Sequence, residues 1–206
     1  FHGVREVAGA QYLALQDVTY GMELPCVFDL KMGVQSWDED APARKSEREA
    51  SKWPPQARLG YRFTGMKVVD EGGEWTTRDT KYAYALPETG LTPTLVDFVD
   101  AGGGKHRTCV LVELLVRLKK LAAVWPDQRQ HRFYGSSLLV VYDAAHTPTG
   151  AAPGPAWGTG TCPHMAVCMI DFGHVWPITD GGTDDGYFLG LNNFILSTEA
   201  AIAALP

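Results

Sequence analysis

The stretch PCVFDLKMG, residues 25–33, contains the pattern that decides the fold. Every second residue from Phe28 to Met32 is apolar, and a period of two residues is typical of a β-strand. One face of the predicted strand therefore belongs against a core. The other face carries Asp29 and Lys31, either as an ion pair or as two groups that serve ligands.

Periodicity predicts further helices and strands on both sides of this strand. A charged run that ends before Trp53 predicts a solvated helix, and VLVELLVRLKKLAAVW, which Pro126 ends, has the strongest helical pattern. Asp184 or Asp185 is suited to cap a final helix. The predicted strands are 11–18, 25–33, 59–69, 132–143 and 166–175, and the predicted helices are 40–52, 110–125 and the C-terminal segment. The order lacks a regular βαβ rhythm, so the sequence predicts an α+β fold.

Composition and charge argue against several classes of protein. The chain has 206 residues and a net charge of −6, whereas a nucleic-acid-binding domain is expected to be basic. No apolar run approaches the ~20 residues of a membrane span, and the first residues lack the pattern of a signal peptide. Four scattered cysteines favour reduced thiols over a disulfide framework. We therefore expect a soluble protein of the cytoplasm, the nucleus or both, without nucleic-acid or membrane partners.

Positive charge is concentrated in one segment. From Lys31 to Lys67 the net charge is +3, whereas the remainder of the chain carries −9. Lys45, Arg48 and Lys52 share one face of the predicted helix, where they grip phosphates or form ion pairs within a solvated helix. A positive patch on an acidic protein fits a small anionic ligand better than a long polyanion.

Polar residues stand at two other strands. Asp171 directly follows an apolar strand, where a carboxylate is costly unless it is paired or binds a metal. A helix cap, a salt-bridge partner and a metal ligand are its three interpretations. Ser136 and Ser137 lie in another apolar strand, where they bond neighbouring backbone or brace an acid on the adjacent strand.

Two more patterns have simple interpretations. AGGGKH, ending at His106, lacks the spaced glycine and the hydroxyl residue of a phosphate-binding P-loop, so a glycine turn is expected. Cys162, His164 and Cys168 lack a second pair of zinc ligands, which favours a packed thiol and a loop histidine.

Four motifs resemble those of the inositol polyphosphate kinase family, in the same order. They are P-x-x-x-D-x-K-x-G at 25–33, S-S-L-L at 136–139, I-D-F at 170–172 and D-x-G-Y-x-x-G-L at 184–191. Together they cover nearly the whole chain. Within the family, LGYRFTGMKV and IDFGHV most resemble the inositol polyphosphate multikinases, whereas HRFYGSSLLVVYD is similar to the inositol hexakisphosphate kinases.

The resemblance implies a two-lobe fold related to that of protein kinases, with ATP held between the lobes. This chain would be mostly the C-lobe with a truncated N-lobe. Residues 1–19 would be an N-lobe remnant and hinge, and residues 20–206 the C-lobe. The C-lobe would contain an inositol-phosphate-binding segment at 38–67 and a flexible loop at 147–160, whose Pro and Gly content is typical of loops.

The resemblance also implies roles for single residues. Gln16 and Val18 would offer backbone groups to adenine, and Asp29 would hold the ribose. Lys31 would contact the transferred phosphoryl group and the substrate, and Asp171 would bind Mg²⁺. The catalytic residues would be Asp29, Lys31 and Asp171, the substrate would be gripped by Lys31, Lys45, Arg48, Lys52, Lys67 and His174, and Ser136 and Ser137 would support the motif.

The implied activity is ATP- and Mg²⁺-dependent phosphorylation of a soluble inositol tris- or tetrakisphosphate, as in the multikinases. The sequence does not show the oligomeric state, and a monomer is favoured. Two alternatives stay open: a hexakisphosphate kinase that makes inositol pyrophosphates, and a catalytically silent inositol-phosphate-binding scaffold. One departure bears on substrate choice. Arg48 and Glu49 replace a glutamine pair that is common in the multikinases, and a carboxylate that faces phosphates repels them.

Overall fold

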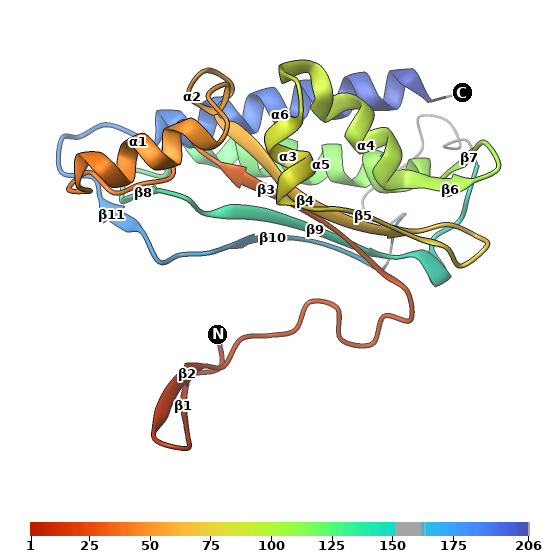
Figure 1. Ribbon diagram of the computed structural model, residues 1–206, viewed down its shortest axis with the longest axis horizontal. Helices are drawn as coiled ribbons and strands as arrows, with labels where there is room; N and C mark the ends of the chain where they lie inside the picture. Colours follow the sequence, from red (N-terminus) through yellow and green to blue (C-terminus); the bar gives the residue numbers. More distant parts are fainter. Residues whose placement is uncertain (151–161, 163, 206) are drawn as a thin grey trace.

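A five-stranded antiparallel sheet is the centre of the computed structural model, which describes residues 1–150, 162 and 164–205. The strand order is β10-β9-β3-β4-β5. The strands are β3 (Pro25–Met32), β4 (Tyr61–Val69), β5 (Trp75–Arg78), β9 (Ser137–Asp143) and β10 (Met165–Ile170). Figure 1 shows the long helices on one side of this sheet and the N-terminal segment on the other. The mixture of helices with an antiparallel sheet confirms the predicted α+β class.

The apolar face of β3 lies at the centre of the core. Its alternate residues are fully buried, whereas the residues between them are only partly buried, which confirms the predicted strand. The Phe28 ring lies 5.0 Å from Phe63, 5.1 Å from Phe98 and 6.4 Å from Phe194, measured between ring centroids. These rings join the sheet to the helices that cover it.

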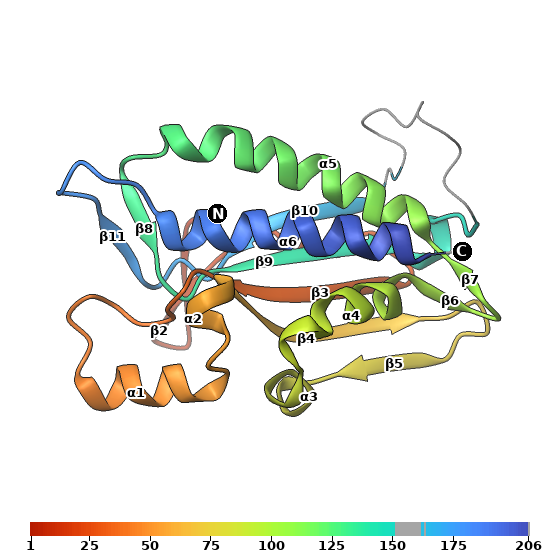
Figure 2. The ribbon, with the colours of Figure 1, turned by 90° about the horizontal axis from the view of Figure 1, so that it is seen from above.

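Three helices, α4 (Leu91–Val99), α5 (Thr108–Val124) and α6 (Asp185–Ala204), cover this face of the sheet (Figure 2). Helix α6 approaches the residue before β4 very closely, since a Cβ atom at Gly190 would lie 1.8 Å from the carbonyl oxygen of Gly60. Only glycine permits this approach. Part of the motif D-x-G-Y-x-x-G-L therefore serves packing.

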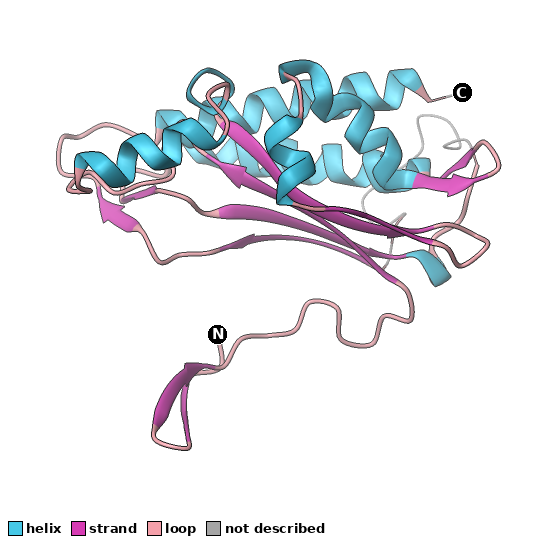
Figure 3. Ribbon diagram, viewed as in Figure 1, coloured by secondary structure: helices cyan, strands magenta, loops and turns pink. Residues whose placement is uncertain are grey.

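The other elements flank this body, as Figure 3 shows by secondary structure. Helix α1 (Ala43–Lys52) buries none of its side chains, in agreement with the predicted solvated helix. The N-terminal hairpin of β1 (Val4–Val7) and β2 (Ala10–Leu13) is joined to β3 by a linker (Figure 1). The remaining elements are α2 (Gln56–Leu59), α3 (Thr80–Ala85), β6 (Asp100–Gly102), β7 (Lys105–His106), β8 (His131–Phe133), β11 (Val175–Pro177) and three short 3₁₀ turns at Glu88–Gly90, Trp125–Asp127 and Ala144–His146.

Three predicted strands are shorter or broken. The strand predicted at 11–18 ends at Leu13, because the chain leaves the hairpin there. The strand at 132–143 breaks at Gly135, where φ is +65°, and the strand at 166–175 breaks at Asp171, where φ is +64°. A positive φ ends an extended segment, so β8 and β11 pair with each other in a separate sheet.

The predicted loop at 147–160 lies outside the described residues from 151 onward. Its first residue, Thr147, is buried and donates to the carbonyl of Asp143 at 2.6 Å. The glycine turn predicted near Lys105 joins β6 to β7. Among the helices that the structure describes, none has the length and apolar character to cross a bilayer.

Candidate active site

The polar face of β3 lies on the side of the sheet away from the long helices. Asp29 and Lys31 both stand there and are partly buried. Lys31 Nζ donates to the carbonyl of Gly135 at 2.8 Å, and the described ion pairs do not join it to Asp29. Asp29 Oδ1 is buried without a hydrogen-bond partner among the described residues. A buried acceptor without a partner is costly, so the structure favours two groups that serve ligands over an ion pair.

Burial shifts the pKa values of both residues toward their neutral forms. It raises the pKa of Asp29, although Ser137 and Thr64 act in the opposite direction. It lowers the pKa of Lys31, although the negative charge of Asp171 opposes this shift. Shifted groups gathered on one open face are a physical mark of a functional site.

Asp171 turns the chain at the end of β10. Its φ of +64° is uncommon for a residue with a side chain, and its side chain is exposed. It lies close enough to Asp29 and Lys31 to raise the pKa of each. Asp184 rather than Asp171 caps the next helix, and the described ion pairs do not include Asp171. Neither a helix cap nor a described ion pair accounts for Asp171, and the third interpretation, a metal ligand, stays a prediction.

The two serines of the S-S-L-L motif point to different parts of the structure. Ser137 pairs with Lys31 on one side and with Ile170 on the other, so it stands between the two strands that carry the acids. It lies near enough to Asp29 to lower the pKa of that carboxyl, although its geometry is not that of a regular hydrogen bond. Ser136 lies instead beside Tyr187 of α6. Ser137 is therefore the serine that lies beside the acid, and its supporting role stays a prediction.

The cations of α1 already face carboxylates. Lys45 Nζ donates to Asp38 Oδ2 at 3.1 Å. Arg48 and Lys52 both pair with Glu49, at 3.4 and 2.6 Å. Burial opposes ionisation of Glu49, but the hydrogen bond and charge of Lys52 outweigh it and lower the pKa of Glu49. A bound phosphate would therefore compete with two carboxylates for these cations.

The remaining predicted substrate residues divide into two groups. His174 Nδ1 lies 2.8 Å from Asp38 Oδ1, so the carboxylate that binds Lys45 also contacts His174. Lys67 instead stands opposite Val27 with its Nζ 4.2 Å above the ring of Trp75. That position is about 13 Å along the strand from Lys31. The structure thus brings His174 to α1 and does not bring Lys67 there.

Arg62 is a candidate that the sequence did not single out. It stands opposite Lys31 on β4, is 4 % exposed, and its Nε and Nη1 atoms have no hydrogen-bond partner among the described residues. A bulge between Asp29 and Leu30 turns Arg62 to the polar face. Its guanidinium lies 5.5 Å from the centre of the Tyr84 ring, but buried N–H groups without an acceptor are costly, so an anion would suit them. The signal was an arginine between two aromatic residues, Tyr61 and Phe63, of the predicted strand.

Gln16 and Val18 lie in the linker that precedes β3. Figure 1 shows this linker on the same side of the sheet as the polar face of β3. The described hydrogen bonds include none to the backbone of either residue. Their role in adenine binding, which the resemblance implies, stays a prediction.

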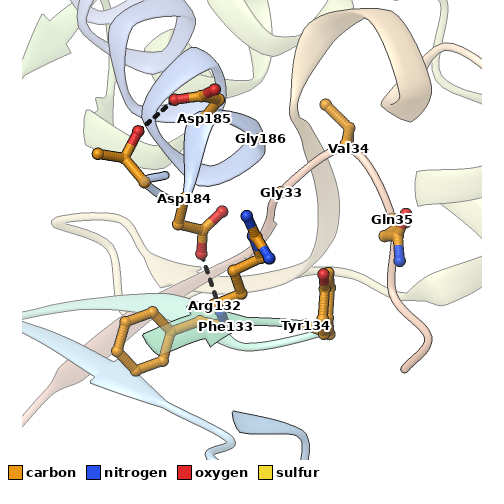
Figure 4. Close-up of a pocket in the computed structure, with 10 residues that line it drawn as sticks. Gly33, Val34, Gln35, Arg132, Phe133, Tyr134, Asp184, Asp185 and Gly186 are labelled. Carbon is orange, nitrogen blue, oxygen red and sulfur yellow. Dashed lines mark hydrogen bonds between the residues drawn. The ribbon is translucent and has the colours of Figure 1, made fainter. Parts of the chain in front are cut away.

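A cavity of about 200 Å³ lies near the end of β3, between α6 and β8 (Figure 4). Asp184 accepts from the backbone N–H of Phe133 at 2.8 Å and of Tyr187 at 3.0 Å. Trp125 donates to the carbonyl of Asp184 at 3.1 Å and stacks on Tyr187. Each carboxylate oxygen of Asp184 thus already accepts one hydrogen bond from the backbone. We interpret the cavity as a gap in the packing that holds β8 in place, and we call it the packing cavity.

The acids of the open face fit a magnesium–nucleotide complex. Among the residues that the structure describes, no three His, Cys, Asp or Glu side chains form a metal cluster. Mg²⁺ is usually held by one or two carboxylates together with substrate phosphates. Asp171 provides one exposed carboxylate, and the unpartnered Oδ1 of Asp29 provides an acceptor for a ligand hydroxyl.

Comparisons with known proteins identify the family of the chain. The family model "Inositol polyphosphate kinase" matches residues 12–199. The chain is 34% identical over 205 residues to human inositol hexakisphosphate kinase 3, covering 90% of this chain and 50% of that protein. It is 32% identical over 214 residues to the inositol polyphosphate multikinase of Oryza sativa subsp. indica, covering 92% and 68%. The chain spans about half the length of the hexakisphosphate kinases that it matches.

Solved structures show the same fold. The inositol phosphate multikinase of S. cerevisiae, solved with ADP and Mn²⁺, superimposes with a TM-score of 0.77 at 18% identity, covering 96% of this chain and 86% of that one. A second inositol phosphate multikinase structure gives 0.74 at 21% identity, covering 91% and 84%. This confirms the kinase-like fold that the motifs implied. The chain belongs to the inositol polyphosphate kinase family.

Proposed function

We propose that the protein transfers a phosphoryl group from ATP to a soluble inositol polyphosphate. The observation that carries this proposal is the meeting of Asp29, Lys31 and Asp171 on one open face, beside a buried arginine with two nitrogens that have no hydrogen-bond partner among the described residues. Phosphoryl transfer depends mainly on positioning and on neutralising charge at the phosphate oxygens. Carboxylates, a lysine and a basic helix in one place provide these functions.

Each residue has one task in this proposal. Asp29 accepts a hydrogen bond from a ribose hydroxyl through its unpartnered oxygen. Lys31 exchanges the carbonyl of Gly135 for a phosphate oxygen, and contact with that anion favours its charged form. Asp171 holds Mg²⁺, which neutralises phosphate charge when it is bound. Lys45, Lys52 and Arg62 screen the phosphates of the inositol ring.

We propose a tris- or tetrakisphosphate as substrate, as for the multikinases. The multikinases and the hexakisphosphate kinases match this chain at similar identity, 30–34%. One observation supports inositol hexakisphosphate as an alternative substrate. Arg62 adds a buried cation to the substrate side, and an additional cation suits a more highly phosphorylated ring. Hexakisphosphate phosphorylation is therefore the second candidate.

A product assay tests the proposal. The intact protein is incubated with Mg²⁺, radiolabelled ATP and each inositol phosphate from tris- to hexakisphosphate, and the products are resolved by chromatography. We expect label in a tetrakis- or pentakisphosphate, and the second candidate predicts label in a pyrophosphate. Binding of every inositol phosphate without labelled product would instead indicate the silent scaffold.

A further inference from the structure

Helix α1 carries cations of the site but is weakly attached to the body. It has ten residues and buries no side chain. A helix of this length is marginal on its own in water, so residues at its two ends must fix its position. At the C-terminal end, the indole of Trp53 donates to the carbonyl of Leu86 at 2.7 Å. At the N-terminal end, Asp38 makes the attachment.

Asp38 joins α1 to β11 through one carboxylate. Its Oδ2 accepts from Lys45 at 3.1 Å, and its Oδ1 accepts from the indole of Trp176 at 3.1 Å. The same Oδ1 lies 2.8 Å from His174 Nδ1. The side chain is only 13% exposed, so these contacts are shielded from water. Two of its three partners are residues that the resemblance assigns to the substrate.

We propose that Asp38 is a positioning residue that holds Lys45 and His174 in one fixed arrangement, and thereby determines which ring hydroxyl of the inositol phosphate faces the phosphoryl donor. This inference rests on the proposed function. Asp38 touches neither ATP nor the ring; it acts through the two side chains that do.

The contact with His174 fixes that side chain further. The described hydrogen bonds do not include this pair, but two acceptor lone pairs 2.8 Å apart would repel each other, so the proposal places a proton on Nδ1. Nε2, the other ring nitrogen, then faces away from Asp38 and is the atom available to the substrate. An inositol phosphate that reaches the site would therefore meet the Lys45 ammonium and the Nε2 edge of the His174 imidazole.

An acid inside a phosphate-binding region needs a reason, because it repels the substrate. Burial raises the pKa of Asp38, but the hydrogen bonds from Lys45 and Trp176 and the nearby His174 outweigh burial and lower it. The carboxylate therefore stays ionised and keeps its donors. In this proposal, the gain from holding Lys45 and His174 in place compensates for the repulsion between the Asp38 carboxylate and the substrate phosphates.

The neighbouring acid, Glu39, supplies a matched control. Its Oε1 accepts from the hydroxyl of Tyr134 at 2.8 Å and from Arg132 at 3.3 Å. Arg132 lies in β8, and Tyr134 follows that strand directly. Figure 4 shows Arg132 and Tyr134 at the packing cavity. Glu39→Gln thus removes the same charge one residue away, without touching Lys45 or His174.

The experiment compares Asp38→Asn with Glu39→Gln in the intact protein. We expect Asp38→Asn to raise KM for the inositol phosphate about tenfold, the loss of one charged contact, and to leave KM for ATP within about twofold. We also expect a second positional isomer among its products. Glu39→Gln should show neither effect. Unchanged products and KM in Asp38→Asn, or the same changes in both variants, would overturn the proposal.

A second measurement covers a variant that does not fold. Nitrogen-15 NMR of the wild-type protein should show that neutral His174 carries its proton on Nδ1, and a proton on Nε2 would overturn the proposal. If wild type has no kinase activity, the proposed function fails instead. Calorimetry with inositol hexakisphosphate then tests the positioning role alone. Weaker binding by Asp38→Asn than by Glu39→Gln would support it, and equal binding by both variants would overturn it.

Discussion

Two carboxylates of the central sheet, Asp29 on β3 and Asp143 at the end of β9, show opposite behaviour. Asp143 is 1% exposed and accepts from three backbone N–H groups and from His146. Burial would raise its pKa, but those hydrogen bonds outweigh burial and lower the pKa to about 2. Asp29 keeps an oxygen without a partner, and burial raises its pKa. A saturated carboxylate serves the fold, and an unsaturated one is available to a ligand.

Among the carboxylates that we assign to ligands, Asp171 should give the largest effect when it is replaced, as in Asp171→Asn. We expect turnover to fall by at least ~10²-fold, because a neutral amide no longer neutralises the metal and phosphate charge. The melting temperature should stay the same, since the side chain is exposed. Steady-state kinetics and calorimetry measure both quantities. Asp127→Asn, at another exposed acid, is the control, and normal turnover in Asp171→Asn would remove the metal assignment.

Asp143→Ala should give the largest effect on the structural side. It leaves the partly buried N–H groups of Glu23 and Leu24 without their acceptor. We expect the free energy of unfolding to fall by about 3 kcal/mol, measured by urea titration. Asp97→Ala breaks only an exposed pair with Arg78, so it should cost less than about 1 kcal/mol. Equal losses in the two variants would contradict the structural role.

Acid titration should distinguish the two carboxylates by sign. The pKa of Asp143 falls from 3.8 when unfolded to about 2 when folded, so its contribution is full above pH 3.8 and disappears as pH falls through about 2. Wild type should lose about 2 kcal/mol more than Asp143→Asn between pH 4 and pH 2. Asp29 has a raised folded pKa, so its ionisation lowers stability as pH rises above 3.8. Parallel curves for wild type and Asp143→Asn would show that Asp143 is not stabilising.

Glu49→Gln should have the smallest effect, and it should be a gain. Removing this carboxylate frees Lys52 and Arg48 for substrate phosphates. We expect KM for the inositol phosphate to fall about threefold, in line with a partly exposed ion pair. Glu47→Gln changes an exposed acid of the same helix and is the control. A higher KM in Glu49→Gln would mean that the carboxylate orients the cations instead of competing for them.

The sequence predicted the parts of the fold that repeat locally. The alternation around Phe28 and the acid at Asp184 were sufficient for β3 and the cap of α6, because both depend on neighbours along the chain. It did not predict α4, whose apolar face is defined only by the core that it covers. Nor did it predict the breaks at Gly135 and Asp171, because backbone angles are not visible in apolar periodicity.

The site shows the same division. The motifs pointed to Asp29, Lys31 and Asp171, and the structure places them together. Arg62 was missed because the bulge that turns it toward Lys31 is a property of two paired strands. The pairing of Lys45 with Asp38 was also not predicted, since it depends on the fold of the loop before α1.

Asp29→Asn, measured for stability and activity in the same preparation, tests the central claim most directly. If the oxygen without a partner is kept for a ligand, the neutral amide should leave the melting temperature unchanged or raise it, because a buried charge is removed. Phosphoryl transfer and the stabilisation of the protein by ADP should both be lost. A lower melting temperature with nucleotide binding intact would contradict the account, since Asp29 would then be a structural carboxylate like Asp143.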